Sequence, residues 1–322
     1  MIRKVVFRAG LVLLLLSSAF ATASPSPNDL IANGRITEAA ASLRARIQAN
    51  PRDAEAYHLL GRAEYALQHW DQAISNGERA VAMQPNNSDY HLWLGRAYGA
   101  KADASNFITA ADLAGKVRDQ FERAVQLNGN NTGARADLAE FYMSAPGFMG
   151  GGKDKARAQA EQLLKTDPAA AHWIYGMLAE KDKKYPVAEQ EFKASVKTAD
   201  DPATRWLDLA SFYRRRGRMT EMEDAVNNAL HVPGRQPHTL YDAAIVLFRS
   251  GRNFNGAVEM LRNYIGSGDP TEEAPAFQAH YLLGMVLEKM GDRTGAAQEY
   301  RASLALAKDF QRAQSALKHL ER

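Results

Sequence analysis

Residues 54–85 read AEAYHLLGRAEYALQHWDQAISNGERAVAMQP, and the spacing of their large and small side chains decides the fold. Numbered from Ala54, the apolar positions keep a helical period in two consecutive segments. Small residues at positions 8 and 20 permit these two helices to cross at close range. A proline at position 32 ends the second helix. The pattern is carried by Tyr57, Leu60, Gly61, Ala73, Ala80 and Pro85.

The same spacing recurs along nearly the whole chain. A degenerate unit precedes the first and ends at Pro51. Two units fit the frame only after insertions, one of ten residues and one of five. The further units begin at Ser88, Thr132, Ala169, Ala203, His238 and Phe277.

Seven or eight units in one frame resemble the tetratricopeptide repeat family, whose 34-residue pattern has aromatic, small and proline positions at these offsets. The resemblance implies an all-α, right-handed solenoid of antiparallel helix pairs. No segment shows sustained strict alternation, so we expect essentially no sheet. We divide the chain into a degenerate first repeat (24–53), a repeat array (54–310) with insertions near 99–116 and 144–152, and a polar-faced C-terminal capping helix (311–322).

Residues 1–23 have the three-part layout of a secretory signal peptide. Basic Arg3, Lys4 and Arg8 precede the apolar run AGLVLLLLSSAF and the small residues ATAS. The run is shorter than the ~20 residues of a spanning helix. We therefore expect cleavage after Ala23, export to a periplasm, and no membrane-spanning segment afterwards. The alternative is an uncleaved N-terminal anchor.

Composition excludes several classes of function. The chain has no cysteine, which rules out disulfides, thiolate zinc sites and a lipid-bearing cysteine. Residues 24–322 contain 37 basic and 37 acidic residues, because residues 1–23 hold three of the 40 Lys and Arg and none of the 37 Asp and Glu. A nucleic-acid-binding protein usually has a clustered basic excess. We therefore expect no nucleic-acid partner.

The glycine-rich stretch SAPGFMGGGKDKA (144–156) contains G-x-x-x-x-G-K from Gly147 to Lys153. A phosphate-binding loop continues with Ser or Thr and follows a buried strand. Here Asp154 follows, and the preceding segment has helical spacing. We therefore predict an enlarged turn between two helices and no nucleotide binding. Two weaker alternatives are an anion on the amides leading to Lys153, and Phe148 and Met149 folded back as an apolar plug.

The other insertion, KADASNFITAADLAGKVRDQ, contains one aromatic residue, Phe107. We interpret it as an extension of the first helix, a loop and the second helix. A flap over the groove is the less favoured alternative.

The resemblance also implies an inner groove lined by positions 2, 5, 9, 12 and 13 of each first helix. Arg62 and Arg96 share position 9 in adjacent units and are expected to lie together on one wall. Arginines beside aromatic residues suit an extended peptide or a carboxylate-bearing ligand; the alternative is solvated residues without a specific partner. The predicted groove residues are His58, Arg62, Tyr65, Arg96, Trp173, Met177, Arg214, Arg215, Arg249 and Tyr281, with Glu140, Glu180 and Asp242 at equivalent positions.

The sequence contains no H-E-x-x-H and no G-x-S-x-G motif, so we predict no enzyme activity, metal or cofactor. His91, His172 and His280 recur at position 4 and are expected to pack between helices. The predicted function is a non-catalytic protein-interaction scaffold that binds a peptide or protein in its groove. The alternative is a small-solute-binding or transporter-accessory protein, with an acidic ligand enclosed near Arg96, Phe148 and Trp173. The oligomeric state and the partner's identity stay open.

Overall fold

The computed structural model describes residues 25–321, and the predicted signal peptide lies outside them. Within this range the chain forms seventeen α-helices, one short 3-10 helix and no strand, which confirms the all-α prediction. The first helices of the units are α3 (Ala54–Ala66), α5 (Ser88–Asp103), α7 (Thr132–Ser144), α9 (Pro168–Lys181), α11 (Pro202–Arg215), α13 (Thr239–Ser250) and α15 (Ala276–Lys289). The second helices are α4 (Trp70–Met83), α6 (Phe107–Leu127), α8 (Lys153–Leu163), α10 (Tyr185–Thr198), α12 (Met219–Leu230), α14 (Phe254–Ser267) and α16 (Arg293–Leu306). The remaining helices are α1 (Pro27–Ala32), α2 (Ile36–Ala49), η1 (Gly147–Met149) and α17 (Gln311–Leu320).

The small residue at position 8 is required by the second helix of its own unit. A Cβ on Gly176 would lie 3.0 Å from the Phe192 ring, and one on Gly284 would lie 2.5 Å from the Tyr300 ring. Both aromatic residues occupy position 24 and are fully buried. The glycine therefore makes room for an aromatic side chain, which sets the distance between the paired helices.

Histidines at position 4 join the two helices of a unit, as predicted. The Nδ1 atom of His172 lies 2.7 Å from Glu191 Oε2, and that of His280 lies 2.7 Å from Glu299 Oε2. Each pair is separated by 19 residues, whereas His91 pairs with Gln120 across 29. The difference is the ten-residue insertion, which lengthens α6 to 21 residues without changing the pairing.

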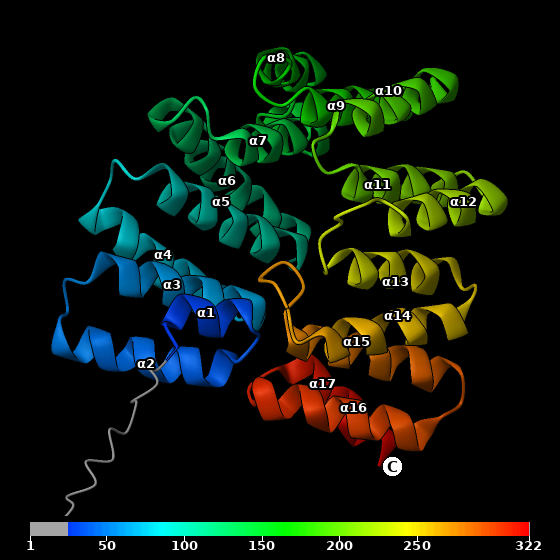
Figure 1. Cartoon of the computed structure of the whole chain (residues 1–322). Helices are drawn as coiled ribbons and strands as arrows, with labels where there is room; N and C mark the ends of the chain where they lie inside the picture. The colour runs from blue at the N-terminus through cyan, green and yellow to red at the C-terminus, as the bar shows by residue number, and fades with distance from the viewer. Residues whose placement is uncertain (1–24, 322) are drawn as a thin grey trace, which may run out of the picture.

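The two ends of the array meet. One buried apolar cluster contains residues of α1–α3, such as Ile31 and Leu43, together with Phe277 and Phe310 near the C-terminal end. Figure 1 shows α1 and α2, at the start of the chain, beside α15 and α17, near its end. The helices α7, α9 and α11 lie nearer the middle of the molecule than α8, α10 and α12. We call this junction the closing contact. An open-ended solenoid has no such contact.

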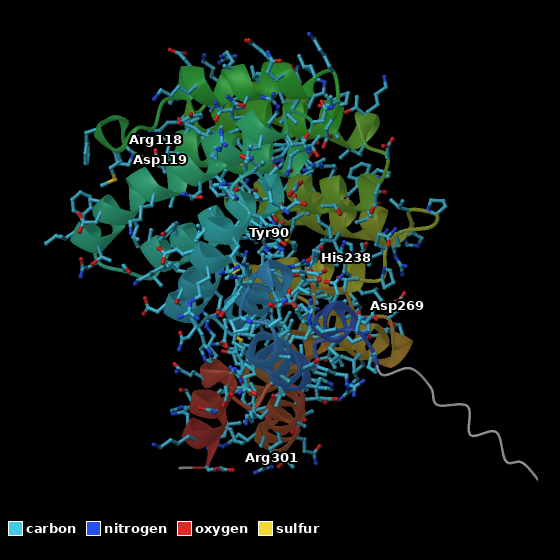
Figure 2. All side chains as sticks on the ribbon, turned by 90° about the vertical axis from the view of Figure 1, so that its left-hand side faces the viewer. Tyr90, Arg118, Asp119, His238, Asp269 and Arg301 are labelled. Atoms are coloured by element: carbon cyan, nitrogen blue, oxygen red, sulfur yellow. The ribbon has the colours of Figure 1, made fainter. Side chains whose placement is uncertain are left out.

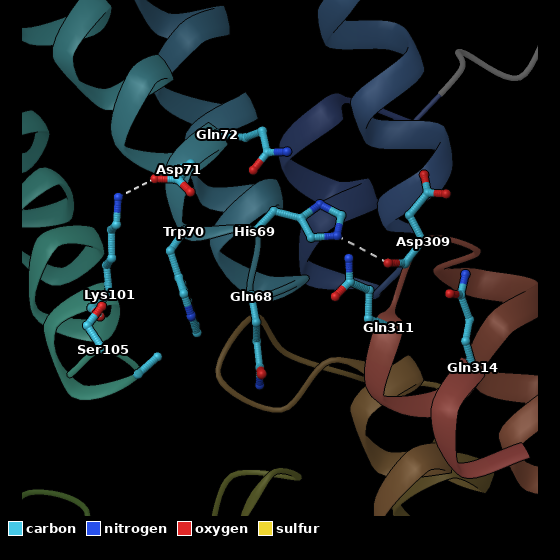
Figure 3. A pocket seen from close by; sticks show the side chains of 11 residues that line it. Gln68, His69, Trp70, Asp71, Gln72, Lys101, Ser105, Asp309, Gln311 and Gln314 are labelled. Atoms are coloured by element: carbon cyan, nitrogen blue, oxygen red, sulfur yellow. Dashed lines mark hydrogen bonds and ion pairs between the residues drawn. The ribbon is translucent and has the colours of Figure 1, made fainter. Parts of the chain in front are cut away.

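Polar bonds accompany the apolar cluster at the closing contact. The backbone N–H of Lys308 donates to Thr37 Oγ1 at 3.1 Å, and His69 Nε2 lies 3.2 Å from the carbonyl oxygen of Asp309. Figure 3 shows His69 pointing across to Asp309 at the edge of a cavity of about 580 Å³. The segment that leads into α17, the helix predicted to cap the C-terminal end, thus contacts the N-terminal repeats.

Among the helices of residues 25–321, none combines the length with the apolarity that a bilayer span requires.

Candidate partner-binding site

The arginine pair predicted on the inner wall surrounds a tryptophan. The guanidinium carbons of Arg62 and Arg96 lie 4.9 and 5.0 Å from the centre of the Trp93 ring, within the range of cation–π attraction. The Tyr65 ring meets Trp93 edge-on at 5.7 Å and Trp70 at 5.3 Å. The prediction that Arg62 and Arg96 lie together is therefore confirmed. Trp93 was missed, because it occupies position 6, which is outside the groove positions of the family.

Both arginines already have carboxylate partners. Arg62 Nε donates to Glu272 Oε1 at 2.8 Å, and its Nη2 also pairs with this carboxylate. Glu272 lies in the loop between α14 and α15, 210 residues away in the sequence. Arg96 Nε donates to Asp137 Oδ2 at 2.6 Å, across to α7. Glu272 has no signal in the repeat frame, because it lies between units.

These residues line a cavity of about 320 Å³, bounded by Arg62, Tyr65, Trp93, Arg96, Glu272 and Gln278. A second cavity of about 370 Å³ begins on the other side of Tyr65 and Arg96 and includes Asp103, Asp137 and Glu140. The first cavity combines aromatic walls with two arginines and the carboxylates of Glu272 and Glu273, whereas the second is mainly acidic.

A second set of predicted groove residues comes together on α9 and α11. Arg215 Nε and Nη2 donate to the two oxygens of Glu180 at 2.9 and 2.8 Å, and Nη2 lies 4.0 Å from the Met177 sulfur. Arg214 Nε is buried without a hydrogen-bond partner in the described part of the chain. Burial lowers the pKa of Arg214, and the charges of Arg215 and Arg249 lower it further.

The inner face also contains carboxyl groups whose charge is disfavoured. Burial raises the pKa of Asp242 to about 6; the neighbouring His238 opposes this shift, and Asp208 and Glu273 add to it. Burial likewise raises the pKa of Asp208 and of Glu140. The arginine-based prediction therefore described only one half of the electrostatics.

Three predicted groove residues serve mainly in packing. His58 is only 8% exposed and stacks on Tyr90 at 4.5 Å, and burial lowers its pKa to about 3. Trp173 packs against two of the buried apolar clusters. Tyr281 meets Phe310 edge-on at 5.2 Å within the closing contact. His58 occupies a predicted groove position, but Tyr90 of the next unit covers its ring there.

The glycine-rich stretch is an enlarged turn, as predicted. A Cβ on Gly151 would lie 1.8 Å from the carbonyl oxygen of Ala145, so only glycine fits there. The amides of Gly151 and Gly152 donate to the carbonyls of Pro146 and Tyr142, which removes them from anion binding. Lys153 pairs with Asp182.

Phe148 is not an apolar plug. Its side chain is 78% exposed, and its ring lies 6.5 Å from that of Phe107, which is 66% exposed. The turn and the start of α6 therefore present aromatic residues outward, while Met149 is partly buried. In Figure 2, Arg118 and Asp119 of α6 lie beside this part of the chain. Neither Phe148 nor Trp173 lines the two cavities described above, both of which include Arg96.

No group of three or more His, Asp or Glu side chains in residues 25–321 is placed to hold a metal ion. The paired and buried carboxyl groups of the inner face are spread over several helices.

A family model described as tetratricopeptide repeat matches residues 28–76, 58–116, 150–204 and 241–309. The chain is 30% identical over 150 residues to the cytochrome c-type biogenesis protein CycH of Pseudomonas aeruginosa, a match that covers 45% of this chain and 33% of that protein. This chain thus matches about a third of the length of that relative.

Solved structures of repeat proteins are similar to this chain at low identity. A thermophilic tetratricopeptide repeat protein of Thermus thermophilus is 20% identical, with a TM-score of 0.48 over 58% of this chain and 96% of that chain. A tetratricopeptide repeat protein of Parabacteroides merdae is 16% identical, with a TM-score of 0.43 over 84% of this chain and 99% of that chain.

Proposed function

The chain belongs to the tetratricopeptide repeat family, and from this premise we propose that it is an exported, non-catalytic scaffold that binds an extended segment of a protein partner on its inner face. Repeat arrays of this kind bind proteins along extended surfaces built from successive units. The partner's segment runs along the first helices, from the arginine pair of α3 and α5 toward α11 and α13.

The observation that carries the proposal is the wall formed by Arg62, Trp93 and Arg96. A guanidinium group binds carboxylates through two parallel hydrogen bonds, and an indole offers a large rigid surface for an apolar side chain. Trp, Tyr and Arg are also the residue types that dominate binding energy at protein interfaces. The second cavity, with Asp103 and Glu140, suits a basic side chain of the same segment.

Export is part of the proposal because of the basic start, the apolar run and the small residues before Ala23. Mass spectrometry of the protein recovered from an envelope fraction tests it. We expect a mature N-terminus at Ser24. Recovery of exported protein that retains Met1 contradicts cleavage.

A pull-down from envelope extract tests partner binding. The bait is the mature chain, compared with an Arg62→Ala, Arg96→Ala variant and with a control that carries Arg157→Ala and Arg301→Ala. Arg157 and Arg301 lie exposed on the second helices α8 and α16, so the control removes the same charge from the outer face. We expect a partner that the control retains and the inner-face variant loses. Equal recovery of every partner by all three baits, with unchanged circular dichroism, refutes the proposal.

A further inference from the structure

We propose that the loop between α14 and α15 is a tethered pseudo-ligand, in which Glu272 occupies the site on Arg62 that binds a carboxylate of an acidic peptide segment. The inference rests on the proposed function and names the chemistry of the segment that this site accepts: neighbouring Glu or Asp residues. A partner then binds by displacing the loop.

The contact between Glu272 and Arg62 has the geometry of a carboxylate ligand bound to an arginine. Both carboxylate oxygens face the guanidinium, and the two side chains are only 20% and 17% exposed. The guanidinium also lies over Trp93. A shielded, two-pronged contact of this kind is the usual way in which arginine recognises a carboxylate.

The loop has a fixed base and a protruding tip. Near its base, the Tyr264 hydroxyl donates to the carbonyl of Ala274 at 2.5 Å and accepts from the backbone N–H of Thr271 at 3.0 Å. Between these anchors, Glu272 and Glu273 form an adjacent pair of carboxylates, and both line the arginine cavity. Figure 1 shows the loop extending from the start of α15 toward α3 and α5.

The tip therefore resembles a short acidic peptide that the chain itself supplies. When it leaves, it removes two negative charges from the cavity and exposes Arg62 beside Trp93 and Arg96. A basic segment would gain nothing from this displacement, because the site that becomes free is cationic. The apparent affinity for an acidic segment is reduced by the fraction of molecules in which the loop occupies the site.

Binding of acetyl-tetraglutamate-amide to the full mature chain, followed by calorimetry, tests the proposal. Glu272→Gln keeps the side-chain shape and removes the charge, and we expect it to tighten binding about tenfold, a usual size for coupling between competing contacts. Adding Arg62→Ala to this variant should abolish the gain. The control is Glu321→Gln, which makes the same charge change in an exposed ion pair with Arg301. The proposal is wrong if Glu272→Gln binds the peptide no more tightly than the control.

A second measurement follows the loop directly and does not need the Glu272 variant to fold. The chain has no cysteine, so Glu273→Cys gives a single labelling site beside Trp93 and Trp70. A bimane label at this position is quenched by the tryptophans. We expect its emission to rise as tetraglutamate is added. If the bimane emission does not change at saturating peptide, the peptide and the loop do not share a site, and the proposal is wrong.

The two proposals fail separately. Loop displacement by tetraglutamate, together with equal recovery of all partners in the pull-down, overturns the proposed function alone. A partner that depends on Arg62, together with an unmoved loop, overturns the pseudo-ligand alone.

Discussion

The closing contact makes a sharp prediction about Gly34, in the turn between α1 and α2. Gly34 has φ +70°, and a Cβ there would lie 2.7 Å from the backbone nitrogen of Ala276 and 3.2 Å from that of Phe277. Gly34→Ala therefore forces the first repeat away from α15. The matched control is Gly251→Ala, because Gly251 has the same φ of +70° and its Cβ would meet no atom within 4 Å.

The magnitude follows from the difference between the two sites. Both substitutions place an L-residue in the left-handed region, which costs about 1–2 kcal/mol. Only Gly34→Ala adds a clash, and the atoms it meets are backbone, so no rotamer change relieves it. Overpacking of this kind costs about 1–3 kcal/mol. We expect Gly34→Ala to lower the free energy of unfolding by that additional amount relative to Gly251→Ala.

Urea unfolding of both variants measures this difference, and small-angle X-ray scattering measures the shape. Separation of the ends should raise the radius of gyration of Gly34→Ala and leave that of Gly251→Ala unchanged. The closing contact is absent in solution if both variants lower the free energy of unfolding equally, within about 0.5 kcal/mol, and have the radius of gyration of the wild type.

Three further predictions follow from burial and geometry. Phe310→Ala should cost about 3–5 kcal/mol in urea unfolding, since Phe310 is only 2% exposed, while Phe107→Ala at its exposed site should stay within about 0.5 kcal/mol. Gly151→Ala should cost about 2 kcal/mol or more, because its turn has no room for a Cβ; Gly147→Ala in the same turn, with open space around it, is the control, and equal losses would contradict this explanation. The raised pKa of Asp242, about 6 in the folded chain, means that the folded state binds the proton more tightly, so stability falls as pH rises from about 4 to about 6. Asp242→Asn should remove that fall and be about 3 kcal/mol more stable at pH 7; parallel pH profiles of wild type and variant would refute the shift.

The repeat frame predicted the site in outline, because groove positions depend on helical spacing that any one unit contains. Arg62 and Arg96 share a position in neighbouring units, and the structure brings both onto Trp93. The repeat frame did not distinguish groove positions that are exposed from those that a neighbouring unit covers. His58 occupies a groove position, yet Tyr90 of the next unit covers it. Whether a position is covered depends on the angle between adjacent units, and the residue spacing within one unit does not determine that angle.

Residue spacing alone was enough to predict the helix pair, its repetition and the insertions. These depend on contacts within about one unit, such as Gly176 against Phe192, and a periodic pattern records them. The closure of the array on itself, and the reach of Glu272 to Arg62 across 210 residues, became visible only in three dimensions. The physical reason is that closure is the sum of many small rotations between neighbouring units. Each rotation is set by side-chain packing at one junction between units, and no local sequence pattern determines the sum of these rotations.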